Sequence, residues 1–163
     1  MIIYEISNEQ DKIPVDGEIE NIVKLSVETA AEEFINDVSL EISVTFTDNE
    51  GIKVINNEFR NIDKETDVLS FPQLEFDVLG VIKPEYMPLS DMYPNVMLGD
   101  IVLSLEKAES QAQEFGHSFL REVSYLTVHS MLHLLGFDHI VDEDKLIMRE
   151  KEEEIMSKIG LTR

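Results

Sequence analysis

The sequence contains no cysteine among its 163 residues. This absence excludes a disulfide framework, and it also excludes the thiolate cages that hold many purely structural zinc ions. Basic residues are scarce as well, with 13 Lys and Arg against 34 Asp and Glu, so the formal net charge is -21. Taken alone, this charge argues against a nucleic-acid partner because an acidic surface repels phosphates, although a local basic groove can exist within it.

Apolar runs long enough to cross a membrane are also missing. No stretch approaches the roughly 20 apolar residues that a bilayer span needs. The first five residues lack the basic start and the apolar stretch of a signal peptide. We therefore expect a cytoplasmic protein with no membrane partner. The length and the hydrophobic content of 43% predict one domain over residues 1–163.

Strand and helix patterns alternate along the chain. Period-two patterns and compact apolar runs predict four strands, at residues 2–6, 41–47, 67–71 and 100–104. Helical periodicity predicts five helices, at residues 19–34, onward from a capping box at 47–50, at 105–115, at 119–135, and from a cap at Asp142 towards Gly160. The order of these elements predicts an α/β (α+β) fold.

Three of the predicted helices carry further expectations. The second should turn Ile52, Ile55 and Phe59 inward. The helix at 119–135 is apolar around most of its circumference, so we expect it to be the central helix of the core. The last helix contains the acidic run 152–154, which we expect to lie on a solvated face.

Residues 72–98 lack a periodic pattern. This segment contains Pro84, Pro88 and Pro94 among mixed acidic and apolar residues, which is typical of a long irregular connection. A connection of this length inside a compact domain is unusual, so it is either functional, partly ordered by a hairpin over residues 76–82, or mobile. We favour a mobile flap.

Three of the four histidines lie close together near the C-terminus. His129 and His133 are four residues apart, which places them on one face of a helix, about 6 Å apart along its axis. Gly136 can adopt the left-handed conformation that ends a helix, so the chain can turn back and bring His139 to the same point. The pattern predicts a metal site with His129, His133 and His139 as ligands. The alternative is a metal-free buried helix whose histidines only form hydrogen bonds.

The fourth histidine, His117, fits no ligand spacing, and we expect it to be a surface residue. Imidazole suits zinc, copper, iron or nickel, and we predict one zinc ion per chain. Three histidines leave a tetrahedral position for water, whose pKa zinc can lower to about 7, so the site should be hydrolytic. The spacing equals that of metzincin proteases, but Ser130 stands where a protease needs its Glu base. A metalloprotease-like hydrolase therefore remains an alternative, but the sequence lacks the general base of that class.

Two separated motifs resemble a known family. The segment from His129 to His139 resembles the signature H-G-x-L-H-L-x-G-Y-D-H of the YbeY family of bacterial endoribonucleases. Upstream, Thr66 to Pro72 matches the family's T-D-V-L-S-F-P, which follows an Arg that Arg60 matches here. Leu98 to Ile101 is similar to the family's L-G-D-I, so the resemblance covers about residues 40 to 160. The sequence departs from the pattern at Ser130 and Phe137, where the family usually has Gly and Tyr.

The resemblance implies a fold, an activity and partners. The fold is a small mixed sheet of four strands flanked by about five helices, with zinc on the three histidines. The activity is zinc-dependent, single-strand-specific endoribonuclease action in ribosomal RNA maturation, at the 3′ end of 16S rRNA, and in ribosome quality control. The partners are ribosomal RNA and the small ribosomal subunit. The acidic surface also suits a basic ribosomal protein. The alternative role is a non-catalytic, zinc-stabilised ribosome assembly factor.

Further roles are assigned with the resemblance in view. Arg60 is expected to clamp a phosphate with its planar guanidinium, although an arginine at a helix end can also simply stabilise the helix dipole. Together with His129, His133 and His139 it forms the predicted catalytic set. Lys64 and Arg121 could extend a positive track, but such side chains are usually only solvated. Asp138 is adjacent to His139 and could orient it, and we leave it outside the metal ligands. Whether water or the 2′-hydroxyl of RNA attacks is open.

Overall fold

A computed structural model describes residues 1–78, 81–88 and 94–162. The main sheet of this part of the chain consists of β1 (Ile2–Asn8), β2 (Ser39–Thr47), β3 (Val68–Pro72) and β6 (Asn95–Ser104). The α-helices are α1 (Gly17–Glu32), α2 (Asn49–Arg60), α3 (Leu105–Phe115), α4 (Phe119–Leu134) and α5 (Asp142–Ile159). A second, small sheet pairs β4 (Phe76–Val78) with β5 (Val81–Ile82), and the short 3-10 helix η1 (Pro84–Tyr86) follows.

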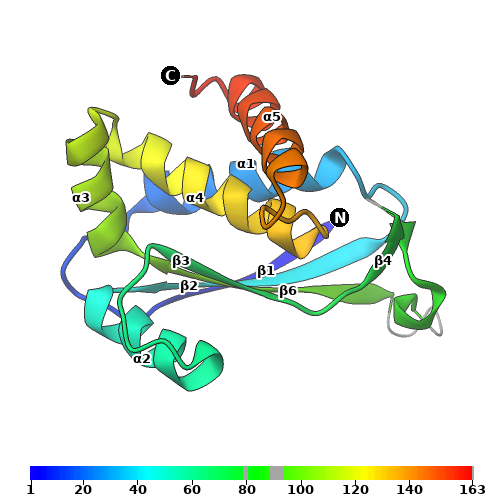
Figure 1. The fold of residues 1–163 in the computed structure, drawn as a ribbon, viewed down its shortest axis with the longest axis horizontal. Coiled ribbons are helices and arrows are strands. Elements are labelled where there is room, and N and C mark those ends of the chain that lie inside the picture. Colours follow the sequence, from blue (N-terminus) through cyan, green and yellow to red (C-terminus); the bar gives the residue numbers. More distant parts are fainter. Residues whose placement is uncertain (79–80, 89–93, 163) are drawn as a thin grey trace.

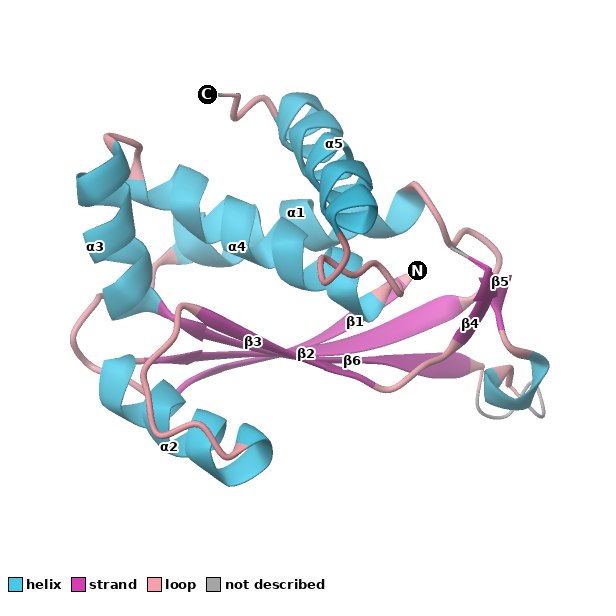
Figure 2. Cartoon of the chain, in the orientation of Figure 1, coloured by secondary structure: helices cyan, strands magenta, loops and turns pink. Residues whose placement is uncertain are grey.

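The main sheet is mixed. Its strand order is β1-β2-β6-β3, in which β1, β2 and β6 are parallel and β3 runs antiparallel to β6. Helices α1, α3, α4 and α5 cover one face of the sheet, and α2 lies on the other (Figure 1, Figure 2). The predicted α/β fold, with a mixed sheet of four strands and five helices, is confirmed for the described residues.

Helix α4 is the central helix, as its apolar circumference predicted. It packs against α1, α3 and α5 and against strands β3 and β6. Val123, Val128, Met131 and Leu132 are completely buried in the main hydrophobic core. Burial on nearly all sides holds the backbone of α4 in place, so side chains at its C-terminal end start from a fixed position. No helix in the described ranges is both long enough and apolar enough to span a membrane.

The N-caps of two helices differ from the sequence prediction. Helix α2 is capped by Asp48, whose carboxylate accepts a hydrogen bond from the Gly51 backbone N–H at 2.8 Å, so the predicted capping box that begins at Thr47 is wrong. Asp is an equally good cap, and here it sits one residue further along. Asp142 is the first residue of α5 rather than its cap, because Val141 occupies the N-cap position without a side-chain hydrogen bond.

The inward face of α2 is narrower than predicted. Ile52 is fully buried, but Phe59 is 65% exposed, so the expectation that Phe59 points inward is wrong. Its ring instead packs edge-on against Phe71 of β3, with the centroids 5.3 Å apart. Helix α2 packs mainly against β6 and β3, so fewer of its residues are covered.

Strand β6 begins at Asn95, five residues before the predicted start at residue 100. Residues 95–99 pair with β2, and the register shifts at a bulge between Glu41 and Ile42. At this bulge Gly99 has a φ of +152°. A Cβ there would lie 2.5 Å from the Phe71 carbonyl oxygen and 2.8 Å from a methyl carbon of Leu134, so Gly99 lets α4 approach the sheet closely.

The segment predicted as an irregular connection is partly ordered. The suggested hairpin over residues 76–82 is present as β4 and β5, and the connection ends earlier than residue 98 because β6 has already begun. The prediction of a mobile flap falls partly on residues 79–80 and 89–93, which lie outside the described residues.

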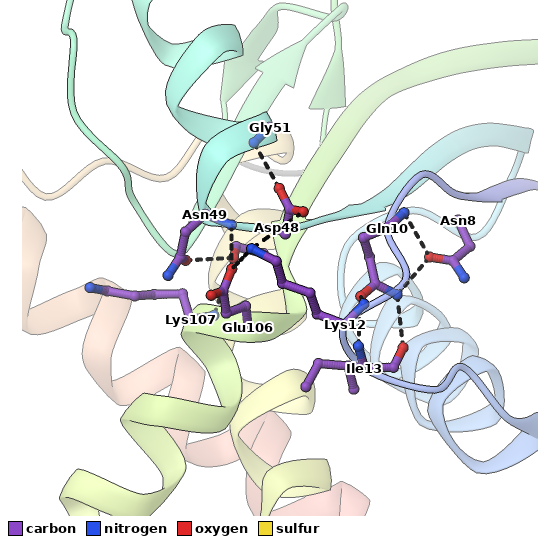
Figure 3. A network of polar contacts seen from close by, with 10 residues as sticks. Asn8, Gln10, Lys12, Ile13, Asp48, Asn49, Gly51, Glu106 and Lys107 are labelled. Atoms are coloured by element: carbon purple, nitrogen blue, oxygen red, sulfur yellow. Dashed lines mark hydrogen bonds and ion pairs between the residues drawn. The ribbon is translucent and has the colours of Figure 1, made fainter.

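A polar network ties the starts of α2 and α3 to one end of the sheet (Figure 3). One carboxylate oxygen of Glu106, in α3, accepts the Asn49 backbone N–H at 3.0 Å and the Lys12 ammonium at 3.2 Å. Ser104, the last residue of β6, donates its hydroxyl to the Asn49 side chain at 2.9 Å. The network joins helices from opposite faces of the sheet where β2 and β6 end, which stabilises the frame that carries α4.

Candidate metal centre

The three histidines predicted as ligands lie together. His129 and His133 are on the last turns of α4, and His139 follows in the loop to α5. One ring nitrogen from each of the three lies within 4.8 Å of the others. The three form the only group of this kind among the described residues, and it could hold a metal ion.

The turn that ends α4 brings His139 back. Gly136 has a φ of +95°. Its N–H donates to the His133 carbonyl at 3.1 Å, and the Phe137 N–H donates to the Leu132 carbonyl at 2.9 Å. These two bonds form a Schellman motif, which reverses the chain directly after the helix. The reversal places His139 beside the two helical histidines, as the sequence predicted from the glycine.

The outer nitrogens of the two helical histidines are both engaged. His133 Nδ1 lies 3.1 Å from the Phe137 carbonyl oxygen, which can only accept, so Nδ1 carries the proton. His129 Nδ1 lies 2.6 Å from Oε1 of Glu152 and donates to this carboxylate. Both Nε2 atoms are thereby left as lone pairs that face each other at 3.2 Å. Two facing lone pairs repel, so this arrangement favours a cation shared by the two Nε2 atoms.

The distance between the two helical ring nitrogens is compatible with zinc. Two nitrogens bound tetrahedrally at about 2.0–2.1 Å from one zinc ion lie roughly 3.3 Å apart, and the two Nε2 atoms are 3.2 Å apart. Burial, followed by the nearby His129 and His139 rings, lowers the pKa of His133 below the ordinary value. A lowered pKa favours the neutral imidazole that a metal needs. The donor set therefore fits a divalent metal that prefers nitrogen ligands.

Glu152 supports the site from α5, and the sequence analysis missed it. It was expected on a solvated face, and this expectation is wrong because Glu152 is only 6% exposed. Besides the bond from His129, its second oxygen accepts the Tyr125 hydroxyl at 3.1 Å. A signal was available: Met148, Glu152 and Ile155 have helical spacing, so the carboxylate shares the buried face of α5. Carboxylates that bind the outer nitrogen of a histidine ligand fix its tautomer and orientation.

The histidines line a groove of about 650 Å³ that we call the metal groove. One wall comes from β3 and the residues before and after it, and the other from the end of α4 and the loop that follows. The lining residues are Arg60, Thr66, Asp67, Val68, Ser70, Pro72, Leu74, His129, His133, Gly136, Phe137, Asp138, His139 and Ile140. Both motifs found in the sequence therefore contribute to one cavity.

Arg60 lies at the edge of this groove, at the last position of α2. One guanidinium nitrogen donates to the Ser70 carbonyl at 3.1 Å, and the guanidinium carbon lies 5.9 Å from the centre of the Phe71 ring. These contacts hold the side chain across β3, while its other N–H groups can still bind an anion. The structure thus brings Arg60 together with the histidines, although 69 positions of sequence separate Arg60 from His129.

The two departures from the family pattern lie beside the ligands. Ser130 is completely buried and its hydroxyl accepts a hydrogen bond from Ser70 at 2.8 Å, so it joins α4 to β3 and does not line the metal groove. Phe137 packs edge-on against Phe34 with ring centroids 5.2 Å apart. Its backbone carbonyl, and not its side chain, contacts His133. Neither departure removes a ligand.

Other predicted residues take different places. His117 is half-buried between α3 and α4 and lies outside the group of possible metal ligands. Asp138 lines the metal groove and accepts the His139 backbone N–H at 2.7 Å, so it positions the loop rather than an imidazole nitrogen. Lys64 and Arg121 do not line the metal groove, and Arg121 lies in a separate hollow between α4 and α5.

Known proteins resemble this chain over almost its whole length. The model of the family described as endoribonuclease YbeY matches residues 5–160. A protein of Clostridium botulinum (strain Loch Maree / Type A3) named Endoribonuclease YbeY is 53% identical, over 99% of this chain and 100% of the relative. One of the same name from Clostridium kluyveri is 55% identical, over 96% of this chain and 98% of the relative. The solution structure of TM1509 from Thermotoga maritima is similar with a TM-score of 0.58 and 25% identity, covering 97% of this chain and 92% of that one.

Proposed function

The chain belongs to the endoribonuclease YbeY family, and from this premise we propose that it cuts single-stranded ribosomal RNA with one zinc ion per chain. The observation that carries the proposal is the convergence of three imidazoles and Arg60 on one groove. Substrate and role follow the resemblance of the two sequence motifs. The substrate is ribosomal RNA, which the protein matures at the 3′ end of 16S rRNA, and the partner is the small ribosomal subunit. The protein also acts in ribosome quality control, in the cytoplasm.

The zinc ligands in this proposal are His129, His133 and His139. Their mutual distances and the engaged outer nitrogens of two of them support the assignment. When bound, zinc supplies a Lewis acid that neutralises charge on phosphate oxygens and activates the nucleophile. Glu152 and the Phe137 carbonyl hold two of the rings so that their Nε2 lone pairs stay directed into the groove.

Arg60 binds the phosphate beside the scissile bond. Its guanidinium is anchored by Ser70 and stacked near Phe71, so little side-chain freedom remains to be lost when an anion binds. The guanidinium stays protonated, and its planar arrangement of N–H groups matches two phosphate oxygens. Arg60 therefore orients the phosphate and stabilises the charge that develops on it.

The groove walls suit an unpaired strand. Ile140, which is 78% exposed, places apolar surface beside the charged groups, and the largely buried Leu74 and Phe137 also line the groove. Bases of a single strand can turn this way and lose contact with water, whereas bases of a duplex are stacked inside it. This arrangement supports single-strand specificity.

Protease action is a poor fit. A metzincin-type base would have to occupy position 130, and Ser130 is completely buried against Ser70 of β3. A side chain there points into the contact between helix and sheet and not towards a substrate. The second candidate is a zinc-stabilised assembly factor that binds RNA without cutting it. The net charge of -21 favours this candidate. So does the lack of a clear general base in the groove, because its two carboxylates, Asp67 and Asp138, already accept backbone N–H groups.

Matched variants test the proposal. His133→Ala and Arg60→Ala should abolish cutting of a single-stranded RNA that carries the 16S 3′ end. His117→Ala is the control for a histidine outside the metal group, and Lys53→Ala is the control for a cation of α2 outside the groove. Both controls should cut at the parent rate. Equal rates in all five proteins would refute the assignment, and firm binding of intact RNA by the parent would favour the assembly factor.

A further inference from the structure

A second hollow lies between α4 and α5 and adjoins the metal centre. It has a volume of about 410 Å³ and is lined by Arg121, Tyr125, Arg149, Glu152, Glu153, Met156, Ser157 and Thr162. A smaller hollow of about 370 Å³ shares Tyr125, Arg149 and Glu152 with it, and shares His129 and His139 with the metal groove. The three cavities therefore form a path from Arg60, past the histidines, to Arg121.

Several cationic side chains lie along this path beside the carboxylates that also line it. Arg121, Arg149 and Lys145 line its two outer hollows, although the whole chain has only 13 basic residues and a net charge of -21. Arg149 is 3.8 Å from Glu153, and Lys145 is 3.7 Å from Asp142, in pairs with exposed side chains. Exposed pairs at such distances are weak, so these cations remain available to another anion.

Within the ranges that the structure describes, the side chain of Arg121 has an unpaired N–H group that points to an anionic ligand. Its Nε atom is shielded from solvent and has no hydrogen-bond partner in the described part of the chain. Buried N–H donors are normally paired, so an unpaired one needs an explanation. A phosphate in the adjoining hollow would supply acceptor oxygens for the guanidinium fork.

The carboxylates of the hollow do not occupy this arginine. Glu152 instead accepts hydrogen bonds from His129 and Tyr125, and the exposed Glu153 forms no ion pair with Arg121 among the described residues. The neighbouring Glu122 is buried, and its pKa is raised first by burial and then by the charge of Asp67, against a smaller opposing effect of Arg121. Such a carboxyl group holds a proton more readily and compensates the arginine less.

The spacing along α4 fits a strand that continues past the metal centre. Arg121, Tyr125 and His129 are four residues apart and so share one face of the helix. At 1.5 Å per residue, the backbone of Arg121 lies about 12 Å from that of His129 along the axis. This span exceeds one nucleotide, so an RNA backbone held at the histidines can place a later phosphate at Arg121.

We propose that the hollow between α4 and α5 binds a phosphate of the RNA strand outside the cleavage site, with Arg121 as its main ligand and Arg149 as a second cation. This inference rests on the proposed function, because it takes single-stranded RNA as the substrate. It adds a phosphate subsite more than one nucleotide from the scissile bond. A strand long enough to reach this subsite binds more tightly than one that fills only the metal groove.

Binding of zinc-loaded full chain to 2′-O-methyl RNA tests the inference, with strand integrity checked on a gel. Single strands of about 4 and about 16 nucleotides are compared by fluorescence anisotropy over a range of salt concentrations. For Arg121→Gln we expect about tenfold weaker binding of the long strand and a salt slope lower by about one, with the short strand unchanged. Arg149→Gln, at a side chain that is 61% exposed, should change both quantities in the same direction by less.

The matched control is Lys24→Gln, a cation of α1 that lies over the Tyr4 ring and lines none of the three cavities. It should bind both strands like the parent. Parent-like affinity and salt slope in Arg121→Gln and Arg149→Gln overturn the inference, whether or not the parent cuts RNA. If the parent cuts no unmodified RNA while Arg121→Gln still weakens long-strand binding, the proposed function fails and the phosphate subsite stands. A parent that does not bind the long strand overturns both.

Discussion

Glu152 and His129 come from different helices, and the Glu152 carboxylate lies 2.6 Å from the His129 Nδ1 atom. This contact determines which nitrogen of His129 faces the other two imidazoles. It also joins α5 to the end of α4 beside the candidate metal centre. The buried carboxylate is therefore as much a part of the site as the ligands, and it leads to the first prediction.

Replacing Glu152 should weaken metal binding. Glu152→Ala removes the acceptor that orients His129, and loss of such a partner typically costs 10–100-fold in metal affinity. Zinc affinity is measured by competition with a chromophoric chelator. Glu153→Ala is the matched control, because its side chain is 63% exposed and contacts no ligand. Equal zinc affinity in Glu152→Ala and the parent would contradict the orienting role.

Introducing a protease-like glutamate should not create a protease. Ser130→Glu would put a charged carboxylate where Ser130 is completely buried against Ser70. We expect the free energy of unfolding to fall by about 3–5 kcal/mol, because an unpaired buried charge is costly. Denaturant unfolding gives the stability change, and a casein assay gives the activity. A stable variant that digests casein would show that position 130 reaches a substrate after all.

Gly99 should not tolerate a side chain. In Gly99→Ala the new Cβ would meet the Phe71 carbonyl oxygen at 2.5 Å, and the residue has a φ of +152°. The expected loss is about 2–4 kcal/mol of unfolding free energy, from steric conflict and backbone strain. Gly17→Ala is the control, since a Cβ there meets nothing within 4 Å. Thermal unfolding should separate the two variants clearly, and a parent-like midpoint for Gly99→Ala would be evidence against this packing.

The metal-free protein should lose stability in mild acid. The pKa of His133 is lowered from 6.5 in the folded chain, so the unfolded chain binds this proton more readily. The unfolding free energy therefore falls as the pH drops below about 6.5, by at most about 1.4 kcal/mol per pH unit for one group. Urea titrations of chelator-treated protein between neutral and acidic pH measure this slope.

His133→Gln removes the titrating ring and should flatten the part of the slope that belongs to it. Lys53→Gln, which changes an exposed cation of α2 outside the metal group, should keep the parent slope in that range. If His133→Gln retains the full parent slope, another group is responsible for the acid sensitivity.

Local spacing made much of the site predictable. His129, His133, Gly136 and His139 lie within eleven residues, and a helix of 3.6 residues per turn followed by a left-handed glycine determines where such side chains go. The central position of α4 was predictable for a similar reason, because apolar residues around a whole helix require cover on every side. These inferences needed only geometry that neighbouring residues impose on each other.

Elements that depend on distant partners were predicted less well. The predicted start of strand β6, at residue 100, was too late. The first half of this strand is extended because it pairs with β2, and a local pattern does not reveal that pairing. Phe59 was expected inside, yet the sheet leaves that end of α2 uncovered. Asp48 and Thr47 are both good caps, and in the structure Asp48 is the N-cap.

The amino-acid sequence by itself determined the strand and helix alternation, the histidine trio and the likeness to an RNA-cleaving family, because each depends on residue types at short fixed spacings. Only the tertiary structure decided that Glu152 is buried against His129, that Arg60 lies across β3 beside the histidines, and that Arg121 faces α5. Those relationships join residues at least 23 positions apart. Such residues meet only where packing of the core brings two elements together, and a linear pattern does not encode that distance.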